Sequence, residues 1–131
     1  MKILDTDVLS TVLKTRQPRR LRRELDDIAL VCTTAINAAE LLYGVTLRDC
    51  PDLTQKWEAR LRPRLSVIPF DHAAAEEYVR VRLYLQAQQM PLGDMDLMIA
   101  SVALANDAVL VTGNTRHFAR VPGLQLENLL E

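Results

Sequence analysis

The chain has 131 residues, of which 49% are hydrophobic and 25% are charged, and its formal net charge is −1. These proportions are typical of a folded globular domain and exclude a long disordered tail, and no apolar run approaches the roughly 20 residues that a membrane-spanning helix needs. Because Asp5 interrupts the N-terminus before a signal-peptide apolar segment can form, we expect a cytosolic protein in which residues 1–131 form a single domain around one hydrophobic core.

Apolar runs and helical patterns alternate from the N-terminus onward. Residues 2–5 predict a first buried strand that ends in acids, and residues 8–13 predict a helix after it. Pro18 can stand in the first turn of a second helix, over residues 19–26. The apolar and partly β-branched residues 28–33 predict a second strand.

The next segment predicts two helices and a short strand. Thr33 or Thr34 can cap the first of these helices, which carries Glu40 on a largely inward face and which Gly44 ends or loosens. A second helix is expected over residues 53–65, interrupted near its end by Pro63. Residues 67–70 predict a third strand.

The remaining pattern completes an α/β domain. Asp71 is a good N-cap for a long helix over residues 73–89, and the Ala-rich residues 97–105 predict a buried helix that starts just after Asp96. Residues 108–112 predict the clearest strand, followed directly by a turn at Gly113 and Asn114. Strands that alternate with helices indicate a mainly parallel central sheet.

Acidic residues occur where the predicted strands end and helices begin. Ligands of an open parallel sheet bind beyond the carboxyl ends of its strands, where Asp5, Asp7 and Asn114 are expected. Asp96 begins a helix, and Glu40 lies in an otherwise apolar helix, where a lone acid costs free energy unless its charge is compensated. Acids that meet at one point repel each other, and a hard divalent cation would compensate them. Taken singly, each acid also has an ordinary explanation as a helix cap, a first-turn residue or a solvated side chain.

Four short motifs occur in order along the chain. They are residues 4–10 (LDTDVLS), 39–44 (AELLYG), 93–100 (GDMDLMIA) and 110–118 (LVTGNTRHF). In this order and at these separations they resemble the motifs of VapC-type PIN-domain ribonuclease toxins of type II toxin-antitoxin systems. Phe70 with Asp71, and residues 122–124, continue the match, so the resemblance covers nearly the whole chain.

The resemblance implies a PIN-like, three-layer α/β/α fold and a Mg²⁺- or Mn²⁺-dependent endoribonuclease. Carried over by position, Asp5, Glu40 and Asp96 are the metal ligands, and Asn114 takes the weaker fourth catalytic position. Two further positions depart from the family pattern and are expected to be accessory. They are Asp7, where relatives commonly have Asn, and His117, where many have an acid and which could act as a general acid.

The same resemblance implies partners. We expect a tRNA or rRNA substrate, a cognate antitoxin protein that holds the enzyme inactive, and a homodimer, with no membrane association. An Arg side chain of the antitoxin could bind a carboxylate of the site in place of the cation. An amphipathic antitoxin helix could pack in an apolar groove around Leu41, Leu42 and Trp57, unless these residues belong to the core.

A group of arginines follows the first predicted helix. Its members, which we call the arginine segment, are Arg16, Arg19, Arg20, Arg22 and Arg23. Guanidinium groups suit phosphate contacts, so the arginine segment could bind the RNA backbone. The alternative is a solvated helix face whose arginines pair with the three acids at residues 24, 26 and 27.

Two other functions compete with the ribonuclease. A non-catalytic PIN-like module could bind RNA or protein without cutting, although it has no use for converging acids that cost free energy. Asp5-Thr6-Asp7 also matches the DxD motif of haloacid-dehalogenase-like phosphatases. Those enzymes additionally use a lysine near the site, and the three lysines here, Lys2, Lys14 and Lys56, do not follow a later strand.

Overall fold

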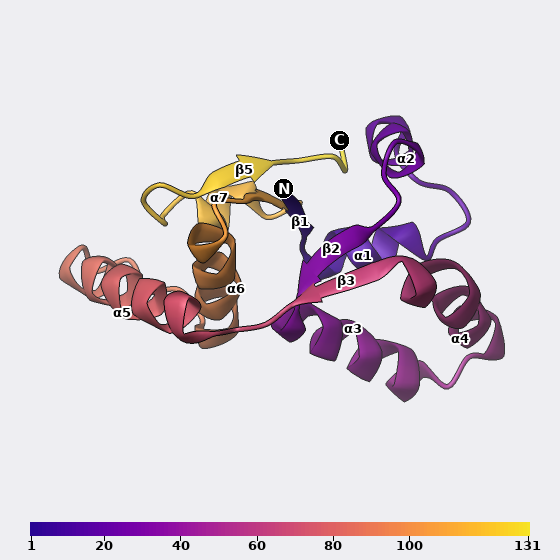
Figure 1. Ribbon diagram of the computed structural model, residues 1–131, viewed down its shortest axis with the longest axis horizontal. Coiled ribbons are helices and arrows are strands. Elements are labelled where there is room, and N and C mark those ends of the chain that lie inside the picture. Colours follow the sequence, from indigo (N-terminus) through magenta and orange to yellow (C-terminus); the bar gives the residue numbers. More distant parts are fainter.

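The computed structural model describes residues 1–131 and contains a five-stranded sheet with helices on both sides (Figure 1). The strand order is β3-β2-β1-β4-β5, and every neighbouring pair is parallel, which confirms the predicted α/β class. The strands are β1 (Lys2–Leu4), β2 (Val31–Thr34), β3 (Leu65–Ile68), β4 (Val109–Val111) and β5 (Gln125–Glu127). The helices are α1 (Thr6–Val12), α2 (Arg19–Asp26), α3 (Ala35–Arg48), α4 (Pro51–Lys56), α5 (His72–Ala87), α6 (Asp94–Ala105) and α7 (Thr115–Phe118).

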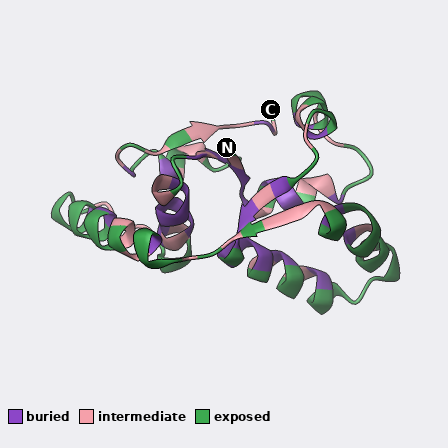
Figure 2. Ribbon diagram, viewed as in Figure 1, coloured by how far each residue is buried: buried purple, intermediate pink, exposed green.

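The sheet separates two apolar clusters, so the expectation of one core is wrong. Ile3 pairs with Leu110, and both side chains belong to a cluster of 14 buried residues to which α5 and α6 contribute. The next residues along the two strands, Leu4 and Val111, also pair and belong to a cluster of 13 buried residues shared with α1, α2 and α3. Successive side chains of a strand point to opposite faces, which explains the division. Figures 1 and 2 show the resulting three layers, with the buried residues concentrated between them.

The chain between Pro51 and β3 is not the single helix expected over residues 53–65. Helix α4 passes into a wider π-helical turn, Trp57–Leu61, and then into a 3-10 turn, Arg62–Arg64. Pro63 has no backbone N–H to donate, so a regular helix cannot continue through it. The wider turn places both Trp57 and Leu61 in the core, and β3 consequently begins two residues earlier than predicted.

Helix α3 continues past Gly44, contrary to the prediction that this glycine ends or loosens it. The helix begins at the predicted cap, because the Thr34 side chain accepts a hydrogen bond from the backbone N–H of Asn37. It ends at Arg48, after which Asp49 adopts a left-handed conformation with φ of 47°. Packing of the buried face of α3 therefore outweighs the weak helix propensity of one glycine.

The other expected elements are present with shifted ends. Asp71 caps α5 as predicted, and its side chain accepts from the backbone N–H of Ala74. Helix α6 begins at Asp94, three residues before its expected start, and α7 and β5 were not predicted. Strand β5 has only three residues and α7 only four, which is too short for a recognisable periodicity. None of the helices combines the length and apolar character needed to cross a membrane.

Candidate active site

The predicted site residues lie at the carboxyl end of the sheet because of how the helices connect to the strands. Helix α1 begins directly after β1, so Asp5 both follows the strand and caps the helix. Helix α3 begins directly after β2 and carries Glu40 in its second turn. Helix α6 precedes β4 with a short turn between them, so the two run in opposite directions. The N-terminal turn of α6, with Asp96, therefore returns to the same end of the sheet.

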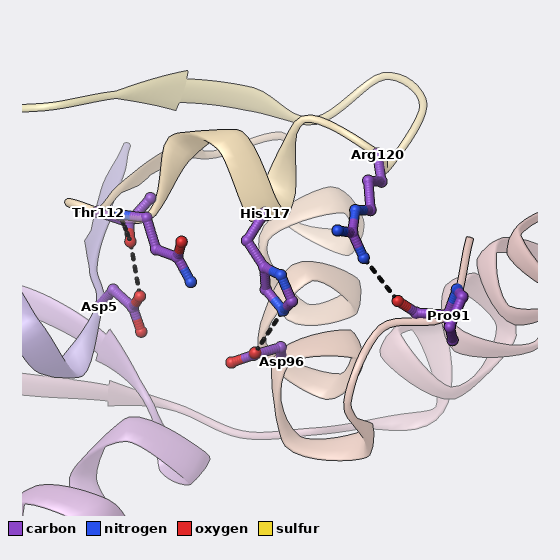
Figure 3. A network of polar contacts seen from close by, with 7 residues as sticks. Asp5, Pro91, Asp96, Thr112, His117 and Arg120 are labelled. Carbon is purple, nitrogen blue, oxygen red and sulfur yellow. Dashed lines mark hydrogen bonds and ion pairs between the residues drawn. The ribbon is translucent and has the colours of Figure 1, made fainter.

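Asp5 is a buried carboxylate that meets only neutral hydrogen-bond donors. The residue is 8% exposed. Its Oδ1 accepts from the backbone N–H of Thr6 (2.9 Å) and from Nδ2 of Asn37 (2.8 Å), and its Oδ2 accepts from Oγ1 of Thr112 (2.7 Å; Figure 3). No ion pair of the structure involves Asp5. Its charge is thus hydrogen-bonded but is not balanced by a cationic side chain.

Glu40 is connected to Asp5 through two neutral side chains. Nδ2 of Asn37, which donates to Asp5, also donates to Oγ1 of Thr6 (2.9 Å). Oγ1 of Thr6 in turn donates to Oε1 of Glu40 (2.8 Å). Glu40 is half-buried and, like Asp5, takes part in no ion pair. Two of the three predicted metal ligands therefore share one hydrogen-bond network.

Asp7 lies beside this network and contacts the turn after β4. Its Oδ2 accepts from the backbone N–H of Gly113 (2.9 Å). Partial burial of the carboxylate raises the pKa of Asp7, the negative charge of Asp5 raises it further, and the hydrogen bond from Gly113 opposes both. A Cβ atom on residue 113 would lie 2.8 Å from this same Oδ2 and 2.9 Å from Cδ1 of Leu130, so a side chain at this position would displace the Asp7 carboxylate and Leu130.

Asp96 contacts His117 rather than the other acids. Its Oδ2 lies 3.1 Å from Nε2 of His117, as Figure 3 shows. An ionised carboxylate only accepts hydrogen bonds, so we assign the proton of this contact to Nε2. The His117 ring also packs edge-on against Phe118, with ring centroids 6.0 Å apart. Asn114 is exposed; its backbone N–H donates to Oγ1 of Thr112 (3.0 Å), its backbone oxygen accepts from the N–H of Phe118 (3.3 Å), and its side chain makes no hydrogen bond.

The three predicted ligands do not form a closed metal-binding group in this structure. No three His, Cys, Asp or Glu side chains lie together as such a group. The chemistry of the donor set fits Mg²⁺ or Mn²⁺, because carboxylate oxygens are their preferred protein ligands. The charges fit as well, since no Lys or Arg pairs with Asp5, Glu40 or Asp96. Metal binding by these residues remains a prediction.

Three polar residues of the site were not singled out from the sequence. Thr6 stands between two predicted site residues, Asp5 and Asp7, and Thr112 is the last residue before the Gly113 turn. Asn37 precedes Glu40 by three residues, which brings the two side chains to neighbouring positions on α3. The three-residue spacing of Asn37 and Glu40 on an otherwise apolar helix face was the signal in the sequence that could have identified Asn37.

The arginine segment is exposed and free of acidic partners. All five of its guanidinium groups lie outside the ion pairs of the structure. Arg20 donates to the backbone oxygen of Asn128 (3.1 Å), and Glu24 pairs with Lys2 (2.7 Å) instead of with an arginine. The ion pairs with the following acids that the alternative expected are therefore absent, whereas the solvated helix face that it also expected is present, so RNA binding by the arginine segment stays a prediction.

The apolar groove expected around Leu41, Leu42 and Trp57 differs from the one observed. Leu41 and Trp57 belong to the core, whereas Leu42 is 43% exposed. A cavity of about 340 Å³ lies nearby, between α1, α3 and α4, with Glu40 among its lining residues. Its apolar lining consists of Leu13, Leu41, Val45 and Leu53.

Comparisons with known proteins agree over nearly the whole chain. The model of the family described as PIN domain matches residues 2–124. The chain is 31% identical over 127 residues to the tRNA(fMet)-specific endonuclease VapC of Shigella flexneri and 33% identical over 129 residues to Ribonuclease VapC2 of Rickettsia felis, each match covering 96% of both chains. The structure of VapBC2 from Rickettsia felis bound to a DNA fragment from their promoter matches with a TM-score of 0.85 and 31% identity over 97% of both chains. The matched residues include every acid of the site.

Proposed function

Because the chain belongs to the PIN domain family, we propose that it is a VapC-type endoribonuclease and the toxin of a toxin-antitoxin pair. We further propose that its Asp5, Glu40 and Asp96 hold Mg²⁺ or Mn²⁺. The observation that carries the proposal is that these acids lie at one end of the sheet without a Lys or Arg partner, and that Asp5 and Glu40 take part in no ion pair at all. Relatives named as a tRNA-specific endonuclease and a ribonuclease support RNA as the substrate, and the first of these names supports tRNA; rRNA stays the alternative class of substrate. Membership in this family removes the phosphatase alternative.

The side chains would hold and orient the reacting groups. A bound divalent cation lowers the pKa of a coordinated water and offsets the charge that develops on the scissile phosphate. Asp5 is held by three donors, and Thr6 orients Glu40. His117 directs its Nε2 proton at Asp96 and so restricts the rotation of that carboxylate. Asn114 is proposed to take the weaker fourth catalytic position, and Asp7, like His117, to have an accessory role.

The arginine segment supplies the proposed contacts to the RNA backbone. Its side chains are exposed, carry no acidic partner and come from the chain segment that follows α1. Phosphate contacts of this kind position a nucleic acid without reading its sequence. The cleavage site would then depend on the shape of the RNA and on which segment reaches the acids.

A protein partner would inhibit the enzyme. The similar Rickettsia felis structure is named as a VapBC2 complex, which supports a cognate antitoxin here. We propose that an antitoxin Arg binds one of the unpaired carboxylates and that an amphipathic antitoxin helix packs over the cavity between α1, α3 and α4. A homodimer remains a prediction that sedimentation equilibrium of the purified chain can check.

The proposal is tested by RNA cleavage with controlled metal content. Folded tRNA is incubated with the purified protein in Mg²⁺, in Mn²⁺ and in excess EDTA, and the new 5′ ends are sequenced. Asp5→Asn, Glu40→Gln and Asp96→Asn should each reduce the rate by more than the roughly 10- to 100-fold typical for loss of an outer-sphere partner of a metal. Glu58→Gln, which changes an exposed acid paired with Arg62, is the matched control and should cleave normally.

Two results would contradict the proposal. Cleavage that persists in EDTA would exclude the metal, and a variant that cuts at the wild-type rate in saturating Mg²⁺ would remove that residue from the site. A folded, Mn²⁺-binding wild type that cuts no RNA would favour the non-catalytic module.

A further inference from the structure

Asn37 is the buried residue at which the contacts of Asp5 and Glu40 converge. It lies outside the four sequence motifs and its side chain is fully buried, at 0% exposure. Both polar atoms of that side chain are used: Nδ2 donates to Oδ1 of Asp5 (2.8 Å) and to Oγ1 of Thr6 (2.9 Å), and Oδ1 accepts from Oγ1 of Thr34 (2.7 Å). The amide group thus reaches one carboxylate directly and the other through Thr6.

The surroundings permit only one orientation of this amide. Exchanging its nitrogen and oxygen would direct an acceptor at the carboxylate of Asp5, which can only accept. Oγ1 of Thr34 already accepts from the backbone N–H of Asn37 (3.1 Å), so its own proton is free to go to Oδ1. The side chain is therefore locked between the start of α3 and the end of β1.

The fixed orientation of the Asn37 amide determines which group donates in the hydrogen bond between Thr6 and Glu40. Because Oγ1 of Thr6 accepts from Asn37, its single proton is available for Oε1 of Glu40 (2.8 Å). Like charges repel, and two flexible carboxylates would otherwise rotate apart. One amide therefore keeps both acids directed toward the same end of the sheet.

The network also leaves particular oxygens available. Oδ1 of Asp5 accepts two hydrogen bonds, which fills its two lone-pair positions, whereas Oδ2 accepts only one. Glu40 uses Oε1 for Thr6, and its Oε2 accepts no hydrogen bond in the structure. The unused positions are thus on Oδ2 of Asp5 and on Oε2 of Glu40.

We propose that Asn37 is a positioning residue that holds Asp5 and Glu40 in their common arrangement before a divalent cation binds. This inference rests on the proposed function, because it assumes that these acids receive the cation. The competing role is structural: Asn37 lies in the first turn of α3, next to its cap, and its loss could affect only folding. Cation affinity separates the two roles.

The test measures the dissociation constant of Mn²⁺ by electron paramagnetic resonance, together with thermal melting of the metal-free protein. Asn37→Ala should raise this Kd roughly 10- to 100-fold, the range known for outer-sphere partners of metals. Thr6→Val should also raise it, and the double variant should show less than the product of the two effects, because the path to Glu40 passes through both residues. Asp71→Ala removes the corresponding cap of α5, far from the site in sequence, and should lower the melting midpoint without changing the Kd.

The outcomes divide cleanly. If Asn37→Ala and Thr6→Val melt earlier but bind Mn²⁺ with the wild-type Kd, the role is structural and the inference is overturned. If Asn37→Ala does not fold, the Mn²⁺ Kd of Thr6→Val, compared with the Kd of Asp71→Ala, decides the same question. If the wild type itself binds no Mn²⁺, the metal site of the proposed function falls, and the inference falls with it.

Discussion

Asp7 is the acid of the site whose surroundings disfavour its charged form. Burial of the carboxylate and the charge of Asp5 raise its pKa above the ordinary value of 3.8. A folded-state pKa above the unfolded value means that the folded protein holds the proton more tightly. The free energy of unfolding therefore falls as the pH rises from the unfolded-state pKa through the folded-state pKa, and the loss is complete only above the folded-state pKa.

We predict that Asp7→Asn raises the melting midpoint of the metal-free protein at pH 7. Asn keeps an oxygen that can accept from the backbone N–H of Gly113 and removes the repulsion by Asp5. Well below pH 3.8 the wild-type carboxyl is protonated in both the folded and the unfolded state, so the two melting midpoints should converge. Equal midpoints at pH 7, or a gap that is unchanged in acid, would show that the repulsion has no influence on stability.

The sequence predicts the acids of the candidate site but not the residues that hydrogen-bond to them. Asp5 follows the end of a predicted strand, Glu40 lies in an otherwise apolar helix, and Asp96 begins a helix. Each of these positions distinguishes the acid from an ordinary surface residue. Asn37 and Thr112 are residue types that serve equally as caps and as core hydrogen-bond partners. Their contacts with Asp5 join residues separated by 32 and 107 positions, which no local pattern reveals.

At the level of elements, α3 offers a direct check of its observed length. Gly44 lies in the interior of the helix, and an added Cβ would meet no atom within 4 Å. Gly44→Ala should therefore raise the free energy of unfolding by about 0.5–1 kcal/mol, measured by urea denaturation. A lower stability would mean that the helix loosens at residue 44, as the sequence had suggested.

The arginine segment gives a second prediction at this level. Each phosphate contact that is lost should reduce the slope of log K against log salt by about 0.7–0.9. Replacing the four arginines of α2 with Ala should therefore flatten the salt dependence of tRNA binding, measured in EDTA to prevent cleavage. Arg60→Ala, which removes an exposed arginine elsewhere, is the control. If the slope stays at its wild-type value, α2 is only a solvated helix.

Long periodic elements were predictable, and short or irregular ones were not. Helices α2 and α5 were expected within about two residues of their observed bounds, because their apolar spacing is regular. The π-helical turn at Trp57 and strand β5 depend on tertiary packing that overrides local preference. The two apolar clusters follow from strands buried on both faces, which look like simple apolar runs in the sequence.

In the whole molecule, the parallel sheet brings chain segments that are distant in sequence together at one end, where Asp5, Glu40 and Asp96 have no Lys or Arg partner. We predict that gentle purification from the native host recovers a second, smaller protein bound to this chain. Mutating one Arg of that protein to Ala should release ribonuclease activity. Repeated recovery of the chain alone, active and harmless when overproduced, would exclude the toxin role and leave the nuclease intact.

We propose that Asp5, Glu40 and Asp96 form one metal site, and the substitution Asp96→Asn tests this proposal most directly. The structure connects Asp5 with Glu40 by hydrogen bonds but directs Asp96 to His117. Calorimetric titration with Mn²⁺ of the wild type and of Asp96→Asn compares the complete and the incomplete donor set. We expect heat of binding for the wild type and its loss in a folded Asp96→Asn. Identical binding curves for the two proteins, or no heat in the wild type, would show that Asp96 is not a ligand of a shared metal site.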